Sequence, residues 1–230
     1  MPDATDPETP RGIDYQRLYE YRHRGADPAS RAAVWNEIAP FVHVKMGRPT
    51  KVLDPAAGWG EFINAVPAVE RWMVDAVEFP EHRRDPEVKA IFGDIRDVDL
   101  PDDYFGGIFV SNLLEHFATQ DDIAEFLRRM RRATAPGGRI VVMGPNFRYC
   151  AKEYFDFADH VLALTHVAIT EHLYASGFEV ESVTPRFLPY SFGGILPPAP
   201  SLTRLYLKMP LAWRVLGKQF LVVGTKPASS

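Results

Sequence analysis

The sequence is poor in cysteine, in basic charge and in long apolar runs. Its 230 residues include a single cysteine, Cys150, which excludes an intramolecular disulfide and a cysteine-rich metal site. The formal net charge of -4 argues against a nucleic acid or an anionic membrane as the main partner. No run of about 18 apolar residues occurs, so we expect no transmembrane segment.

The start of the sequence also lacks the basic and apolar regions of a secretory signal. Residues 1–12 are polar and rich in proline, and we expect them to form a disordered tail; residues 227–230 are expected to form a second tail. These absences favour a cytoplasmic protein. The hydrophobic share of 46% is typical of a globular core, and the length suits one large domain with appendages.

A glycine turn between an apolar strand and a helix is the most informative stretch. Residues 51–54 have the character of a buried strand, and Gly58 and Gly60 then let a ligand approach the backbone closely. A dinucleotide-binding turn would carry a third glycine where Ile63 stands. Glu61 would repel a pyrophosphate at the start of the helix. The turn therefore suits a ligand that has no phosphate and carries positive charge nearby.

S-adenosylmethionine is such a ligand, because its methionine end carries an ammonium and a sulfonium. Asp54, Gly58 and Gly60 match an acidic residue followed by Gly-x-Gly, and the segment resembles the first motif of class I S-adenosylmethionine-dependent methyltransferases. Residues 55–57 depart from the more glycine-rich turn of many members. An ordinary strand–helix turn without a ligand is the alternative, since short glycine motifs also arise by chance.

Acidic residues follow the next two expected strands. We expect strand two over residues 73–79, with Glu78 near its end, where a carboxylate accepts from both ribose hydroxyls. Asp75 is the competing acid, but this boundary places it mid-strand, and a carboxylate facing water is the alternative for Glu78. In the family pattern, Asp94 after strand three accepts from the adenine amine and Ile95 covers the ring. The resemblance implies these cofactor-binding residues: Asp54, Ala56, Gly58, Gly60, Phe62, Glu78, Phe79, Asp94, Ile95, Asn112 and Leu113.

The fourth expected strand, residues 105–112, is almost continuously apolar, as a central parallel strand is. It runs into Asn-Leu-Leu-Glu-His at 112–116, which resembles the fourth methyltransferase motif, beside the methionine half of the cofactor. Thr119 and Asp122 predict a capping box for the next helix. The arginine-rich end of that helix is expected to be a solvated face. A tight turn at 136–138 should lead into strand five.

The later part of the chain resembles a narrower group, bacterial methyltransferases often associated with glycan or natural-product assembly. The resemblance extends over residues 15–226 and is carried by residues 145–149, 154–160, 163–165, 185–190, 204–208 and 217–219. It implies a Rossmann-like α/β domain over residues 49–226. Helices flank its seven-stranded sheet, and the last strand of the sheet is antiparallel. Residues 13–48, aromatic and basic and then amphipathic, predict an N-terminal helical lid.

An insert at 185–218 separates the last two expected strands and is far longer than a usual connection. It contains apolar residues with basic flanks, which would also suit a membrane surface or a lipid-linked substrate. We favour a helix that packs on its own sheet or on a second subunit. A homodimer is therefore one of the expected arrangements.

Methyl transfer is an in-line displacement, for which the enzyme supplies approach geometry and a pocket poor in water. A hydroxyl acceptor also needs a base. The candidate catalytic residues are His116, Asp156 and His160, with Asp159 beside them. Asp156 and His160 are four residues apart and would share one face of a helix, either as a catalytic or as a structural pair. The two histidines are too isolated in sequence to predict a metal site.

Further polar and aromatic residues are candidates for the acceptor cavity. Arg148 and Arg186 would suit a carboxylate or phosphate of the substrate, or would pin loops. The candidate substrate-binding residues are Tyr19, Arg22, Asn146, Arg148, Tyr149, Arg186 and Tyr190.

The resemblance and the acidic positions together predict an S-adenosylmethionine-dependent methyltransferase. The expected acceptor is an oxygen or nitrogen of a small molecule, either a sugar or a natural-product intermediate. An NAD(P)-dependent oxidoreductase on a similar sheet and a non-catalytic S-adenosylmethionine-binding subunit are the alternatives.

Overall fold

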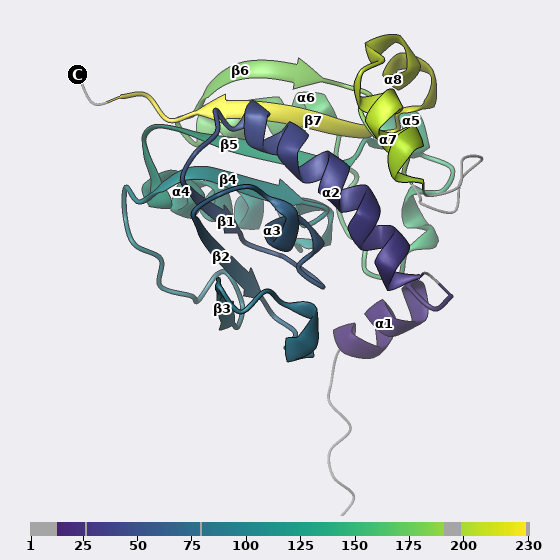
Figure 1. The fold of residues 1–230 in the computed structure, drawn as a ribbon. Helices are drawn as coiled ribbons and strands as arrows, with labels where there is room; N and C mark the ends of the chain where they lie inside the picture. Colours follow the sequence, from purple (N-terminus) through teal and green to yellow (C-terminus); the bar gives the residue numbers. More distant parts are fainter. Residues whose placement is uncertain (1–12, 26, 79, 191–198, 229–230) are drawn as a thin grey trace, which may run out of the picture.

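A seven-stranded sheet forms the middle layer of the protein, with helices on both faces (Figure 1). The computed structural model describes residues 13–25, 27–78, 80–190 and 199–228. The strands are β1 Lys51–Asp54, β2 Glu70–Asp75, β3 Val88–Phe92, β4 Phe105–Ser111, β5 Thr134–Pro145, β6 Glu179–Thr184 and β7 Gln219–Thr225. The helices are α1 Tyr15–Arg22, α2 Pro28–Lys45, α3 Glu61–Ala65, α4 Gln120–Ala133, α5 Phe147–Cys150, α6 His166–Ala175, α7 Pro200–Leu207 and α8 Pro210–Leu216.

The strand order is β3-β2-β1-β4-β5-β7-β6. Neighbouring strands from β3 to β5 are parallel, whereas β7 runs antiparallel to both β5 and β6. The expected sheet with an antiparallel last strand is confirmed. The order reverses between β1 and β4, and open α/β sheets bind their ligands at the carboxyl ends of the strands beside such a reversal. The glycine turn after β1 lies at this reversal.

Two apolar cores hold the layers together. On one face α2, α3 and α7 bury residues such as Ile38 and Phe62 against the sheet, and on the other face α4 and α6 bury residues such as Phe126 and Leu173. The capping box of α4 is present as expected: Thr119 Oγ1 accepts from the Asp122 amide at 3.1 Å, and Asp122 Oδ2 accepts from the Thr119 amide at 2.9 Å.

Two expected strand boundaries were wrong. β2 begins at Glu70, which pairs with Lys51, and ends at Asp75, because Asp75 Oδ1 accepts from the Val77 amide at 2.9 Å and so favours a turn there. β5 begins at Thr134 rather than after the glycine pair. Thr134 already pairs with Phe105 of β4, so the expected turn at 136–138 lies inside the strand.

The part of the insert that the structure describes packs on the same domain. α7 lies beside α2, as Figure 1 shows, and Arg204 forms an ion pair with Glu37 at 2.6 Å. Leu207 is buried, and Trp213 of α8 packs edge-on against Phe187 at 5.2 Å between ring centroids. None of the described helices is both long and apolar enough to cross a membrane. The expected tail at 1–12, the last two residues of the expected tail at 227–230, Phe79 and residues 191–198 of the insert lie outside the described residues.

Candidate active site

The glycine turn after β1 is covered by the N-terminal helix α1. Gly58 and Gly60 have φ angles of +53° and +78°, which L side chains rarely adopt, so the turn requires glycine at both positions. A Cβ at Gly58 would lie 2.5 Å from the Tyr19 hydroxyl. The ring of Trp59, between the two glycines, lies 5.6 Å from that of Tyr19 and 4.9 Å from that of His23. The aromatic residues of α1 and its end therefore close over the turn.

Three carboxylates surround this turn. The Asp54 side chain is nearly buried, and burial together with the charges of Asp75 and Glu61 raises the pKa of its carboxyl to about 8. Burial also raises the pKa of Asp75, whose Oδ2 accepts from the Gly58 amide at 2.7 Å. Glu61 is paired with Arg31 at 2.7 Å. A cationic ligand would relieve the cost of ionising Asp54, so the donor set fits the ammonium and sulfonium of S-adenosylmethionine.

The carboxylate at the end of β2 is Asp75 and not Glu78. The expectation that Asp75 lies mid-strand was therefore wrong. Glu78 lies three residues beyond the strand and is exposed. Asp75 touches the glycine turn directly, through its bond to Gly58. The geometry makes Asp75 the better-placed partner for a ribose, with Glu78 as the rival.

Asp94 and Ile95 follow β3, as expected, but both have other contacts. Arg96 Nε lies 2.9 and 3.0 Å from the two oxygens of Asp94, and this pairing lowers the pKa of the Asp94 carboxyl. Ile95 is buried in the core on the α4 side of the sheet. Asp94 would have to share its oxygens between Arg96 and an adenine amine.

The chain turns sharply at the end of β4. Asn112 is exposed with φ +48°, and its amide donates to the Met143 carbonyl at 2.9 Å. The short helix η2, Leu114–His116, then directs Glu115 and His116 toward the sheet edge. Glu115 is 2% exposed, and this burial raises the pKa of its carboxyl.

His116 is held in one tautomer by the segment after β5. Its Nδ1 donates to the backbone carbonyl of Asp159 at 2.8 Å, which leaves the lone pair on Nε2 when the ring is neutral. The carboxylate of Asp159, itself buried, lies 3.5 Å from the same nitrogen and also forms an ion pair with Arg22 of α1. Sequence alone named Asp159 but had no signal to rank it above Asp156.

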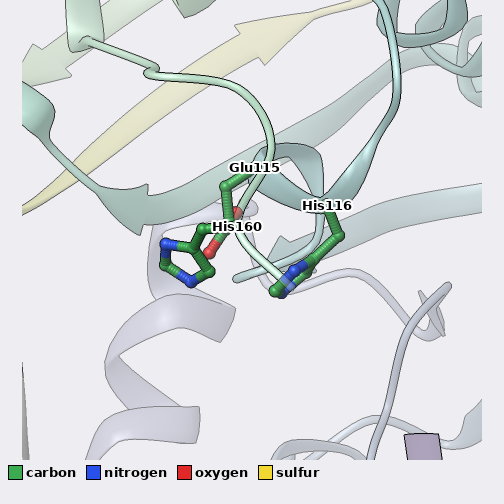
Figure 2. Close-up of side chains that lie close together, drawn as sticks. All are labelled: Glu115, His116 and His160. Atoms are coloured by element: carbon green, nitrogen blue, oxygen red, sulfur yellow. The ribbon is translucent and has the colours of Figure 1, made fainter. Parts of the chain in front are cut away.

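His160 lies beside this group. Its ring centroid is 5.1 Å from that of His116, and Figure 2 shows His116, His160 and Glu115 gathered around one point. The potential ligand atoms of these three residues lie within 4.8 Å of one another. Burial, followed by the charge of His116, lowers the pKa of His160 to about 4. The expectation that the two histidines are isolated was wrong, because the fold joins segments that are far apart in sequence.

The expected helical pairing of Asp156 with His160 was also wrong. The short helix η3, Tyr154–Asp156, ends before Phe157, which is extended at φ −96° and ψ 125°. Asp156 is exposed, whereas His160 packs against the ring of Phe157 at 5.1 Å between centroids. The two side chains therefore do not share a helical face.

The candidate substrate residues fall into two groups. Arg22 and Tyr190 lie near the histidines: the guanidinium of Arg22 and the ring of Tyr190 both pack on Phe157, at 4.8 Å and 5.4 Å, whereas Tyr19 lies over the glycine turn. The Tyr190 hydroxyl is buried without a hydrogen-bond partner among the described residues. This makes Tyr190 a candidate to meet a ligand.

The second group lies around the end of β5. Asn146 is buried and its Nδ2 bonds His166 Nδ1 at 2.9 Å and the Pro185 carbonyl at 2.8 Å. Arg186 packs over Tyr149 at 4.9 Å and donates to the Gly217 carbonyl at 2.7 Å, so its guanidinium fastens the start of the insert to its end. Arg148 is exposed.

Comparison with known proteins agrees with this geometry. Residues 53–142 match a protein-family model described as a methyltransferase domain. A dTDP-4-amino-2,3,4,6-tetradeoxy-D-glucose N,N-dimethyltransferase of Saccharopolyspora spinosa is 30% identical over 136 residues, which are 56% of this chain and 53% of the relative. The chain thus spans about half the length of that curated relative.

Solved structures show the same fold. A SAM-dependent methyltransferase from Archaeoglobus fulgidus superposes with a TM-score of 0.64 at 18% identity, over 93% of this chain and all of that one (100%). The 1,6-didemethyltoxoflavin-N1-methyltransferase of Burkholderia thailandensis has a TM-score of 0.59 at 19% identity, over 96% of this chain and 93% of that one. The chain therefore has the Rossmann-like fold of S-adenosylmethionine-dependent methyltransferases, and its residues 53–142 match the model of a methyltransferase domain.

Proposed function

We propose that this chain transfers a methyl group from S-adenosylmethionine to an oxygen or nitrogen of a small molecule, a sugar or a natural-product intermediate. The observation that carries the proposal is the buried Asp54 at a glycine turn that also holds Asp75 and Glu61. Such a turn favours a cation without phosphate over a dinucleotide. The N-methyltransferase that the comparison found acts on a nucleotide-linked amino sugar, which supports this acceptor class.

The proposed cofactor site follows the carboxyl ends of the strands. Asp54 and the glycine turn receive the methionine end, and Asp75 at the end of β2, with Glu78 as its rival, receives the ribose. Asp94 and Ile95 flank the adenine, and Asn112 and Leu113 close the site at the end of β4. α1 and α2 form a lid over the turn, because Tyr19 of α1 covers Gly58 and Arg31 of α2 pairs with Glu61.

The proposed reaction requires geometry more than acid–base power. The acceptor attacks the methyl carbon, and the carbon–sulfur bond breaks with its electron pair going to sulfur. Holding both partners in line supplies roughly 7–11 kcal/mol of the barrier. His116 is the proposed proton acceptor, since Nε2 carries its lone pair while Asp159 holds Nδ1. The pKa of His160, about 4, makes it too weak a base for that role at neutral pH. We assign no role in the reaction to Asp156.

The acceptor would enter beside His116 and His160, near Arg22 and Tyr190. A phosphate of a nucleotide-linked sugar would need a cation. Arg148 is better suited to this role than Arg186, whose guanidinium is bonded to the Gly217 carbonyl. The net charge of -4 gives no general basic surface, so we propose a small-molecule acceptor in the cytoplasm rather than a nucleic acid.

Two measurements test the proposal. Calorimetry with S-adenosylhomocysteine should show binding to the purified chain, whereas NADH should give no thermal stabilisation. The reverse pattern would support an oxidoreductase. Methyl transfer from radiolabelled S-adenosylmethionine should then be measured on nucleotide-linked sugars that carry an amine or a hydroxyl. Cofactor binding without transfer to any acceptor in either set would favour a non-catalytic binding subunit.

A further inference from the structure

We propose that Glu115, His116 and His160 bind one divalent first-row transition-metal ion at the acceptor side of the site. The proposal rests on the proposed function for its place in the reaction, because these residues lie beyond β4 and β5, where the acceptor would enter. The binding of the ion itself is independent of that function and is tested separately.

The geometry of the three side chains carries the proposal. One potential ligand atom from each residue lies within 4.8 Å of the others. Two ligands on one ion, each at about 2.1 Å, are separated by about 3.0–3.4 Å, so a small rotation of the side chains closes the site. Figure 2 shows the three side chains close together; Glu115 and His116 belong to η2, and His160 belongs to the segment after η3.

One buried polar atom of the cluster has no partner in the protein's described part. His160 Nδ1 is buried and has no hydrogen-bond partner within the described residues. Burying a polar atom without a partner is costly, so such an atom in a candidate site requires an explanation. Glu115 is 2% exposed, and one of its carboxylate oxygens lies within 4.8 Å of a ring nitrogen of each histidine. A cation among the three side chains would be bound by one atom of each.

The residues around the cluster orient it in the way that metal sites require. The Asp159 carbonyl accepts from His116 Nδ1, which leaves Nε2 free to act as a ligand, and metal-binding histidines are commonly fixed by such a bond on the other nitrogen. The nearby positive charge of Arg22 is offset by its ion pair with the Asp159 carboxylate. Arg22 therefore adds no unpaired positive charge beside the cluster.

The donor set selects the class of metal. Two imidazole nitrogens and one carboxylate oxygen suit Zn²⁺, Co²⁺, Fe²⁺ or Mn²⁺ better than the oxygen-seeking Mg²⁺ or Ca²⁺. Three protein ligands leave open positions, and one of these can take a hydroxyl of the acceptor. In the metal-bound protein the ion takes over the role given to His116 above: it lowers the pKa of that hydroxyl, the proton passes to solvent, and His116 acts as a ligand. This arrangement favours an oxygen acceptor.

Titration of the tag-free chain of residues 1–230 with Co²⁺ after chelator treatment tests the site. The visible absorption of bound Co²⁺ should saturate at one ion per chain, and Zn²⁺ should displace it. H160Q, which removes one ligand, should weaken Co²⁺ binding by more than the roughly 10- to 100-fold that loss of an outer hydrogen-bond partner costs. H172Q is the matched control, since His172 lies on α6 and bonds Gln120; it should bind Co²⁺ as the wild type does.

Calorimetry with S-adenosylhomocysteine, run on the same variants, separates the possible failures. Cofactor binding that survives in H160Q shows that the variant is folded and that the lost Co²⁺ signal comes from the missing ligand. Equal Co²⁺ affinity in the wild type and H160Q, or no Co²⁺ binding by a wild type that still binds cofactor, overturns the metal site. A wild type that binds Co²⁺ but not S-adenosylhomocysteine retains the metal site and removes the proposed function.

Discussion

The affinity for S-adenosylhomocysteine should depend strongly on pH because of Asp54. Its carboxyl is buried beside Asp75 and Glu61, and its pKa is raised to about 8 in the free protein. The ligand retains the ammonium of the methionine end, which stabilises the ionised carboxylate and lowers this pKa on binding. Binding therefore releases a proton at neutral pH, and the affinity should increase as the pH rises toward 8.

The magnitude follows from the ionised fraction of Asp54. With a pKa of about 8, about 1% of the carboxyl is ionised at pH 6 and about half at pH 8, so the affinity should rise about 50-fold between these values. Calorimetry at several pH values measures the slope. Repeating one pH in two buffers that differ in ionisation enthalpy counts the released proton, which should approach one per ligand below pH 7.

Asp54→Asn provides the control, because it fixes the neutral form. The variant should bind weakly with a flat profile between pH 6 and pH 8. A raised native pKa also means that the ionised form destabilises the free protein: the contribution of Asp54 to stability is greatest below its unfolded pKa and is lost as the pH rises through about 8. The free variant should thus be at least as stable as the wild type above pH 8. A flat wild-type profile, or equal slopes in both proteins, would refute the reasoning.

Two further comparisons test the glycine turn. D75N should weaken S-adenosylhomocysteine binding and lower the free energy of unfolding by roughly 1.5–3 kcal/mol, since the Asp75 oxygens accept from the Gly58 and Val77 amides. E78Q, at an exposed position, should change the free energy of unfolding by less than about 0.5 kcal/mol. Calorimetry measures the affinities and thermal unfolding the stabilities, and a larger loss of affinity in E78Q would make Glu78 the ribose partner. G58A should lose cofactor affinity because its new Cβ meets the Tyr19 hydroxyl. G137A is the control: it carries a similar cost of about 1–2 kcal/mol for a positive φ but has open space around it, so it should keep wild-type affinity. Equal affinities of the two variants would show that α1 does not cover the turn.

Local signals in the sequence predicted the elements that need no distant partner. The apolar run at 51–54 and the glycines after it predicted β1 and its turn, because both depend on residues that are adjacent in the chain. The capping box of α4 was predicted for the same reason: Thr119 and Asp122 satisfy each other's backbone amides within one turn. The all-apolar character of β4 predicted a strand buried on both faces.

Boundaries that depend on neighbouring strands were predicted less well. The residues at 70–72 include Glu70, Arg71 and Trp72 and look polar for a strand start, yet they pair with β1 because Arg71 donates to the Asn64 carbonyl and Asp85, and Trp72 donates to Glu70. These tertiary hydrogen bonds satisfy the polar side chains, whose presence in the sequence argued against a strand at 70–72. The shift of three residues moved the strand-end carboxylate from Glu78 to Asp75.

The meeting of His116 and His160 follows from strand order and not from sequence spacing. β4 and β5 are parallel neighbours, with Ser111 opposite Met143, so the segments that follow both strands emerge at the same edge of the sheet. The spacing of His116 and His160 along the chain gives no sign of their contact. The expected helix over residues 156–160 paired His160 with Asp156 instead. Once the order β1-β4-β5 is known, a polar residue after one of these strands is best compared with those after its neighbours. By that rule Glu115 and His116 after β4 lie near His160 after β5, and Asp54 at the end of β1 lies near Asp75 at the end of β2. One edge of the sheet therefore holds the carboxylates of the proposed cofactor site beside the imidazoles and carboxylate of the proposed acceptor site.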